Sequence, residues 1–132
     1  MIWSLNRFYE VALALKPADN GLAHHCTFAF HKKKLLAIGV NTRKTSPRNL
    51  PNRYITRGQD VSGMVGTHSE LSAIIKLGME DCSHLTFVNI RIDNNGRLAL
   101  SAPCKGCQNL LRQVGYKRLY FSSNCGNLLP YD

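Results

Sequence analysis

The chain has 132 residues, with 17 Lys and Arg against 8 Asp and Glu, which gives a formal net charge of +9. This length is that of one ordinary domain, and a hydrophobic content of 44% is enough for a single core. No segment approaches the ~20 apolar residues of a membrane span and no signal peptide is evident, so we expect no membrane partner. The five cysteines are therefore interpreted as thiols in a reducing compartment. The sequence predicts a cytoplasmic protein with a single domain over residues 1–132.

One helix and two strands are predicted before residue 42. After the possible cap Ser4, apolar residues follow helical spacing: Leu5, Phe8, Tyr9, Ala12 and Leu13. Residues 25–30 alternate in the manner of a strand. Residues 35–40 form a continuous apolar run, which is typical of a strand covered on both faces. The Lys32-Lys33-Lys34 run between the two strands is interpreted as a polar hairpin tip.

Residues 42–66 are loop-like and basic. A loop of this length inside a compact domain is usually functional. Its cations, with no acidic residue among them, are Arg43, Lys44, Arg48, Arg53 and Arg57. Together with the net charge they favour an anionic partner, which can be a nucleotide phosphate, RNA or DNA. We predict that this loop, with Arg43 and Lys44 at its start, contacts the phosphate of a substrate.

The second half of the chain alternates helices and strands. A helix is predicted from Thr67 to Gly78, and a strand over residues 85–92, followed by a tight turn at Asn95-Gly96. Pro103 suits the first position of a further helix, which stops at Gly115. Strands are predicted over residues 118–122 and 127–129. The order is that of an α/β domain.

Two short motifs combine the ligand types that zinc prefers. His68-Ser69-Glu70 opens one predicted helix, and Pro103-Cys104-Lys105-Gly106-Cys107 opens the next. A structural zinc site normally has four protein ligands, whereas a catalytic site has three and leaves the fourth position to water. His68, Cys104 and Cys107 supply three ligands and leave Glu70 as a free carboxylate. The helix starts also favour negative charge, which predicts that both cysteines are thiolates.

Each motif also has a simpler explanation. Thr67-x-x-Glu70 is a capping box, in which Glu70 only satisfies a backbone amide, and isolated Cys or His residues are often structural. A closed structural zinc would need a fourth ligand from this set: Cys26, Cys82, His84 or Cys125. The histidines that flank the first strand are predicted to face solvent: His24, His25 and His31. The coincidence of both motifs favours the open zinc site.

The chain resembles the cytidine/deoxycytidylate deaminase superfamily over nearly its whole length, from Ala37 to Tyr120. The pattern H-x-E…P-C-x-x-C is highly specific for this superfamily, and Gly39-x-Asn41 and Tyr120-Phe121-Ser122 add weaker support. The resemblance implies a three-layer α/β/α sandwich around a mixed sheet of about five strands. Because few residues follow Ser122, we expect the last strand to be antiparallel, in a terminal hairpin.

The resemblance also implies a site and a reaction. Zn²⁺ is bound by His68, Cys104 and Cys107, Glu70 is the proton shuttle, and Asn41 and the backbone of Ser69 contact the substrate. The expected reaction is the hydrolytic deamination of cytosine to uracil, by a zinc-bound hydroxide, in a free nucleoside or nucleotide. The alternatives are deamination of cytosine or adenine within RNA or single-stranded DNA, and a non-catalytic zinc-binding module. A homo-oligomer is expected from the resemblance alone.

Some residues depart from the pattern of the superfamily. Ser72 stands where deoxycytidylate deaminases often carry Asn, and Ser69 stands where Ala is usual. A terminal hairpin is typical of free-nucleoside cytidine deaminases, but these enzymes often use a third Cys at the position of His68. The branch of the superfamily is therefore left open by the sequence.

Overall fold

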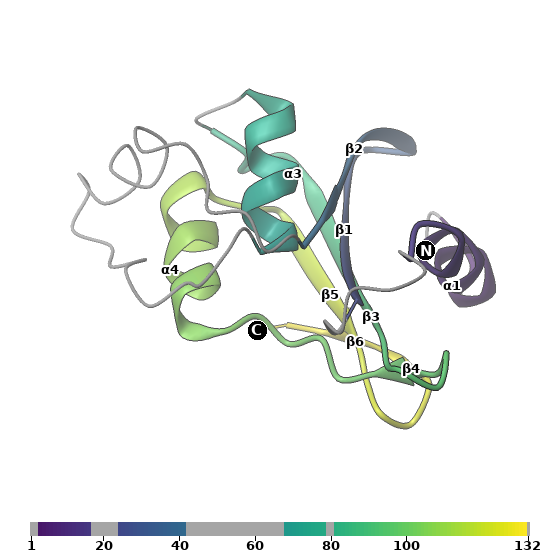
Figure 1. The fold of residues 1–132 in the computed structure, drawn as a ribbon. Coiled ribbons are helices and arrows are strands. Elements are labelled where there is room, and N and C mark those ends of the chain that lie inside the picture. Colours follow the sequence, from purple (N-terminus) through teal and green to yellow (C-terminus); the bar gives the residue numbers. More distant parts are fainter. Residues whose placement is uncertain (1–2, 17–23, 42–67, 79–80, 132) are drawn as a thin grey trace.

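The computed structural model describes residues 3–16, 24–41, 68–78 and 81–131, which form a mixed sheet with helices on both faces (Figure 1). The elements are α1 (Leu5–Ala14), β1 (His24–His31), β2 (Lys34–Val40), α3 (Ser69–Leu77), β3 (Thr86–Ile92), β4 (Leu98–Ala99), α4 (Lys105–Val114), β5 (Arg118–Ser122) and β6 (Leu128–Pro130). The strand order is β2-β1-β3-β5-β6, and β4 pairs with β3. Of the described pairs, β3 with β5 is parallel and the others are antiparallel. The predicted α/β/α sandwich and antiparallel last strand are confirmed, whereas β4 was not predicted.

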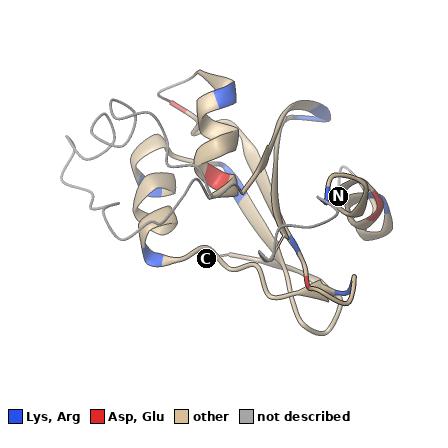
Figure 2. Ribbon diagram, viewed as in Figure 1, with Lys and Arg blue, Asp and Glu red and all other residues tan. Residues whose placement is uncertain are grey.

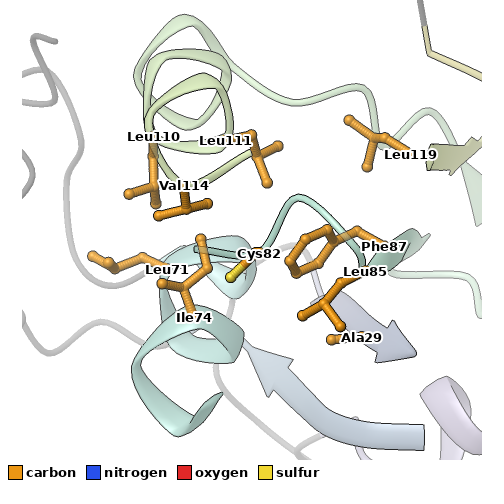
Figure 3. Packing of buried hydrophobic residues seen from close by; sticks show 10 residues of the cluster. All are labelled: Ala29, Leu71, Ile74, Cys82, Leu85, Phe87, Leu110, Leu111, Val114 and Leu119. Atoms are coloured by element: carbon orange, nitrogen blue, oxygen red, sulfur yellow. The ribbon is translucent and has the colours of Figure 1, made fainter. Parts of the chain in front are cut away.

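The sheet separates two hydrophobic cores. One core lies between the sheet and helices α3 and α4, where the side chains of both helices point toward one another around Cys82 and Phe87 (Figure 3). The other core lies under α1, where Phe8 and Ala12 pack against side chains of β1 and β3. Successive strand residues therefore alternate between an α1 face and an α3/α4 face.

Helix α1 begins as predicted, because Ser4 Oγ accepts a hydrogen bond from the Arg7 amide at 3.2 Å. The predicted inward position of Leu13 is wrong, since this side chain is 40% exposed. Pro17 and Asn20-Gly21, from which the sequence predicts the end of this helix, lie outside the described residues. In the part of the chain that the structure describes, no helix is long and apolar enough to span a membrane.

The apolar run of residues 35–40 forms a strand with both faces covered, as predicted, although most of its residues are only partly buried. It forms β2, but β2 is at the edge of the sheet, and Leu36 is 39% exposed. Helix α3 covers one face of β2 closely, with Gly39 at the point of contact. The two-residue turn Lys32-Lys33 joins β1 to β2, which confirms the hairpin tip.

Both helices of the predicted site begin beside their motif residues. His68 is the N-cap of α3, and Gly78 ends that helix with a φ of 64°, a left-handed conformation that glycine adopts without strain. Thr67 lies outside the described residues. Cys104 is the N-cap of α4, so Pro103 precedes the helix and does not occupy its first position as predicted. Gly115 ends α4 as predicted.

Candidate metal centre

The structure brings the predicted ligands together from the starts of two helices. One nitrogen of His68 and the sulfur atoms of Cys104 and Cys107 all lie within 4.8 Å of one another. His68 Nδ1 is 3.5 Å from Cys104 Sγ and 3.3 Å from Cys107 Sγ. Zn–S bonds of about 2.3 Å and Zn–N bonds of about 2.0 Å place nitrogen and sulfur about 3.5 Å apart around a tetrahedral ion. The cluster can therefore hold a metal ion of this size.

The protein's own groups shift the pKa values of Cys104 and Cys107 in opposite directions. Hydrogen bonds from Cys107 and His68 lower the pKa of Cys104 to about 3, so this residue is a thiolate. The contact with Cys104, burial and the nearby carboxylate of Glu70 raise the pKa of Cys107. The lowered pKa of Cys104 agrees with the predicted thiolate at this helix start, whereas the protonation of Cys107 depends on the charge of a bound ion. A bound cation supplies the charge that a second thiolate requires.

No fourth protein ligand joins the cluster among the described residues. Cys82 belongs to the core between the sheet and the two helices. Cys26 lies in the core under α1, where burial raises its pKa to about 12. His84 stacks edge-on against His31 with ring centroids 5.0 Å apart, and Cys125 is exposed. The described part of the chain thus offers three ligands, as an open site requires.

Glu70 lies beside this cluster and is not part of it. Its side chain is 7% exposed, and Asn89 Nδ2 donates a hydrogen bond to Glu70 Oε2 at 3.0 Å. Burial and the thiolate of Cys104 raise the pKa of Glu70, against the effects of its own backbone amide and of His68. The capping-box explanation places the N-cap at Thr67, whereas His68 is the N-cap of α3. Glu70 is therefore a buried acid next to the metal ligands.

Three polar side chains form a closed ring with this acid: Thr27, Ser69 and Asn89. Thr27 Oγ1 lies 2.8 Å from both Ser69 Oγ and Asn89 Oδ1, and Ser69 Oγ lies 3.2 Å from Glu70 Oε1. A hydroxyl group carries one proton and the amide oxygen of Asn89 only accepts, so the proton of Thr27 goes to Asn89. Ser69 can then donate its hydroxyl proton either to Thr27 Oγ1 or to Glu70 Oε1. All contacts are satisfied at once only when Glu70 carries a proton and donates it to Ser69.

We expect the Thr27→Val substitution to lower the free energy of unfolding by about 1–3 kcal/mol, because it leaves the buried oxygen of Asn89 without its donor. The shape of the side chain is retained, so packing changes little. Thr86→Val is the matched control, since this half-buried strand residue has no side-chain hydrogen bond among the described residues. Urea unfolding of both variants measures the difference. Equal stabilities would contradict the ring.

Of the residues predicted to contact the substrate, only Asn41 and Ser69 lie within the described part of the chain. Asn41 follows β2. Its side-chain Oδ1 accepts a hydrogen bond from the backbone amide of His25 at 2.9 Å, and its backbone amide donates one to the His25 carbonyl at 3.2 Å. Ser69 begins α3 and takes part in the ring around Glu70 through its hydroxyl group. Arg43 and Lys44, with the rest of the basic loop, lie outside the described residues.

Sequence reasoning missed the polar side chains that β1 and β3 contribute. His25 and Arg91 are register partners, two residues beyond Thr27 and Asn89 on the α3/α4 face. Burial, Arg91 and His68 lower the pKa of His25 to about 4, so it is neutral at pH 7. Arg91 Nη1 donates to the Leu100 carbonyl at 3.5 Å, while its buried Nε has no partner among the described residues. A positive charge thus lies close to the site.

The prediction that all three flanking histidines face solvent is wrong for His24. This residue is 1% exposed, and its Nε2 lies 2.8 Å from the Ala12 carbonyl. His25 is half-buried on the α3/α4 face, and His31 is exposed as predicted. The signal available in the sequence was the strict alternation of β1, which had to place neighbouring histidines on opposite faces.

Comparison of the chain with protein-family models, with curated proteins and with solved structures finds no match in any of the three. What the site can do is therefore argued from its own residues.

Proposed function

We propose that the protein is a zinc-dependent hydrolytic deaminase that converts cytosine to uracil in a free nucleoside or nucleotide. The observation that carries the proposal is the combination of three soft ligands with a buried acid that is not one of them. A site that only stabilises the fold has no need of such an acid, because four protein ligands complete a structural zinc. The proposal also agrees with the resemblance of the H-x-E and P-C-x-x-C motifs to deaminases.

Zinc is the metal ion that this ligand set favours. Thiolate and imidazole ligands suit zinc, whereas carboxylate and carbonyl ligands suit magnesium, calcium and manganese. When bound, zinc makes water a nucleophile near neutral pH. His68, Cys104 and Cys107 would hold the ion, and their distances fit the tetrahedral geometry.

Glu70 is suited to carry the protons of this reaction. Water adds to the amino-bearing carbon of the ring and ammonia leaves, so protons must move from water to the ring nitrogen and to the departing amine. A carboxyl with a raised pKa can both accept and release a proton near neutral pH. Asn89 and Ser69 fix its orientation through hydrogen bonds to its two oxygen atoms. Glu70 would therefore act as the proton shuttle.

A second candidate function is the deamination of cytosine or adenine within RNA or single-stranded DNA. The net charge of +9 favours it, since a polynucleotide carries many phosphates. Arg91 beside the site is compatible with a nucleotide substrate and with a polynucleotide, because both have a phosphate near the reacting base. The two candidates differ in the length of substrate that they require.

A substrate panel tests the proposal. Purified protein is incubated with cytidine, deoxycytidine, CMP, dCMP, dCTP, a cytosine-containing single-stranded oligonucleotide and an adenosine-containing RNA hairpin, and ammonia and the product base are measured. Uracil formation from a mononucleoside or mononucleotide supports the proposal. Turnover of only the oligonucleotide or the hairpin supports the second candidate. A protein that binds zinc and deaminates nothing in the panel is a binding module.

We expect Cys104→Ser to weaken zinc binding by more than about 100-fold, since residues that only support a ligand already contribute about 10–100-fold. Cys125→Ser is the matched control, because both cysteines are exposed and only Cys104 belongs to the cluster. Competition with a chromophoric chelator gives both affinities. Equal zinc affinity of the two variants would exclude this metal centre, whether or not the protein is an enzyme.

A further inference from the structure

A hollow lies on the opposite face of the sheet from His68, Cys104 and Cys107. A groove of about 490 Å³ on the α1 face has Lys32, Lys33, Lys117 and Arg118 among its lining residues, together with Val88 and Tyr120. Val88 belongs to the core under α1. Arg118 and Tyr120 alternate with Leu119, which belongs to the α3/α4 core, so they face the same side as Val88. The groove therefore has an apolar and aromatic base with cations around it.

The four cations come from two distant parts of the sequence. Lys32 and Lys33 form the turn between β1 and β2, where Figure 2 shows basic residues, and Lys117 and Arg118 begin β5. Strand β3 separates β1 from β5, so these two strands lie about 10 Å apart, with one pair of cations at the end of β1 and the other at the start of β5. Positive charge is thus present on both sides of the groove.

These charges are not explained by the fold. Within the described part of the chain, the four side chains form no ion pair, and no Asp or Glu lines the groove. Lys32 adopts a φ of 55°, a left-handed conformation that glycine and asparagine accommodate better than lysine. A turn selected for stability alone would carry one of those residues. The ammonium groups leave the groove with an uncompensated positive charge.

We propose that this groove binds single-stranded nucleic acid, with one nucleotide over Tyr120 and Val88 and its flanking phosphates on the two pairs of cations. A nucleotide within a strand has a phosphate on each side, which matches cations on both sides of the groove. A free nucleotide carries its phosphates on one side only. An aromatic side chain below cations is the usual combination for binding single strands without sequence preference.

The groove is separate from the proposed catalytic site. It lies where β3 and β5 begin, at Thr86 and Arg118, whereas Asn89, further along β3 and on its other face, donates a hydrogen bond to Glu70 beside the clustered His and Cys residues. Binding there would hold the protein on nucleic acid and does not require deaminase activity.

Fluorescence anisotropy with a short labelled oligo(dT) tests the proposal, because thymine is a substrate of neither candidate reaction. Each phosphate contact contributes about 0.7 to the slope of log affinity against log salt concentration for single strands. We expect the double variant Lys117→Ala/Arg118→Ala to bind at least tenfold more weakly at low salt, with a slope reduced by about 1.4. Tyr120→Leu is expected to weaken binding at an unchanged slope, since stacking involves no counterion.

Arg97→Ala/Arg112→Ala is the control variant, because it removes the same charge from two exposed side chains outside this groove. We expect it to retain the affinity within about twofold. An equal loss in both double variants would show that only net charge matters and would overturn the proposal. Competition by dTTP as strong as that by unlabelled oligo(dT) would also overturn it, since the groove would then be a mononucleotide site.

Discussion

Replacing Glu70 with Gln is expected to reduce the turnover of the best substrate by about 10⁴-fold, the upper end of the range for a general acid–base group. The reason is that, in the proposed reaction, the carboxyl of Glu70 accepts and releases several protons in each catalytic cycle. Glutamine keeps the size and polarity of the side chain but cannot exchange a proton. Steady-state assays with the wild-type protein and the variant measure the effect.

The same variant is expected to fold and to bind zinc as well as the wild-type protein. Glu70 is not one of the clustered ligands, so the metal content should not change. The amide of glutamine can donate to Ser69 Oγ and accept from Asn89 Nδ2, as the protonated acid does. Because a neutral group also avoids the burial of a charge, we expect the variant to be at least as stable as the wild-type protein.

Glu10→Gln is the control for a change of charge alone, since Glu10 is exposed on α1. It should leave both activity and stability unchanged. A Glu70→Gln protein that retains activity within tenfold of the wild type would remove the proposed proton shuttle. A large loss of stability in that variant would instead show that an ionised carboxylate is needed in the ring.

The cluster of His68, Cys104 and Cys107 could be predicted from the sequence because each motif fixes its own local geometry. Cys104 and Cys107 lie at the N-cap and in the first turn of α4, so their spacing alone places both sulfur atoms at one helix start. His68 occupies the same position in α3. What the sequence could not show is that the two helices begin next to each other, since this depends on the order of strands in the sheet.

The ring around Glu70 could not be predicted for the same reason. Thr27 and Asn89 become neighbours only through the antiparallel register of β1 and β3. A weak signal was present, since Asn89 interrupts an otherwise apolar strand and a buried polar residue needs a partner. The meeting of Lys32 and Lys33 with Lys117 and Arg118 left no such signal in the sequence.

The place of β2 at the edge of the sheet could not be predicted, because an apolar run does not distinguish a central strand from an edge strand that a helix covers. Helix α3 packs on β2 and buries one of its faces. On the other face, Leu35, Ile38 and Val40 are partly buried against the core under α1. Such a strand is as apolar as one in the middle of the sheet.

Gly39→Ala is expected to disrupt the site from a distance, through the packing of α3 on β2. A Cβ atom at this position would lie 2.3 Å from the Ser69 carbonyl oxygen, 2.4 Å from the Ala73 amide nitrogen and 2.9 Å from the Ala73 Cα. All three atoms belong to the backbone, so no side-chain rotation can relieve the contact. Helix α3 must move away from the sheet by roughly 1 Å to reach ordinary contact distances.

This movement would change the site because His68, Ser69 and Glu70 all lie at the start of α3. Ser69 would separate from Thr27, and Glu70 from Asn89, which breaks hydrogen bonds that are now 2.8 Å and 3.0 Å long. His68 would move relative to the two cysteines of α4. We expect a loss of about 3 kcal/mol in the free energy of unfolding, the upper end of the range for overpacking. Zinc affinity should fall together with stability.

Gly126→Ala separates this effect from the general cost of replacing a glycine. Gly126 has a φ of 80° and open space around its Cα, so alanine there is strained by its backbone but displaces nothing. We expect that variant to lose about 1–2 kcal/mol and to keep its zinc affinity. Urea unfolding and chelator competition on both proteins give the comparison. If Gly39→Ala binds zinc as tightly as Gly126→Ala does, then α3 does not hold the metal ligands in place through its contact with β2.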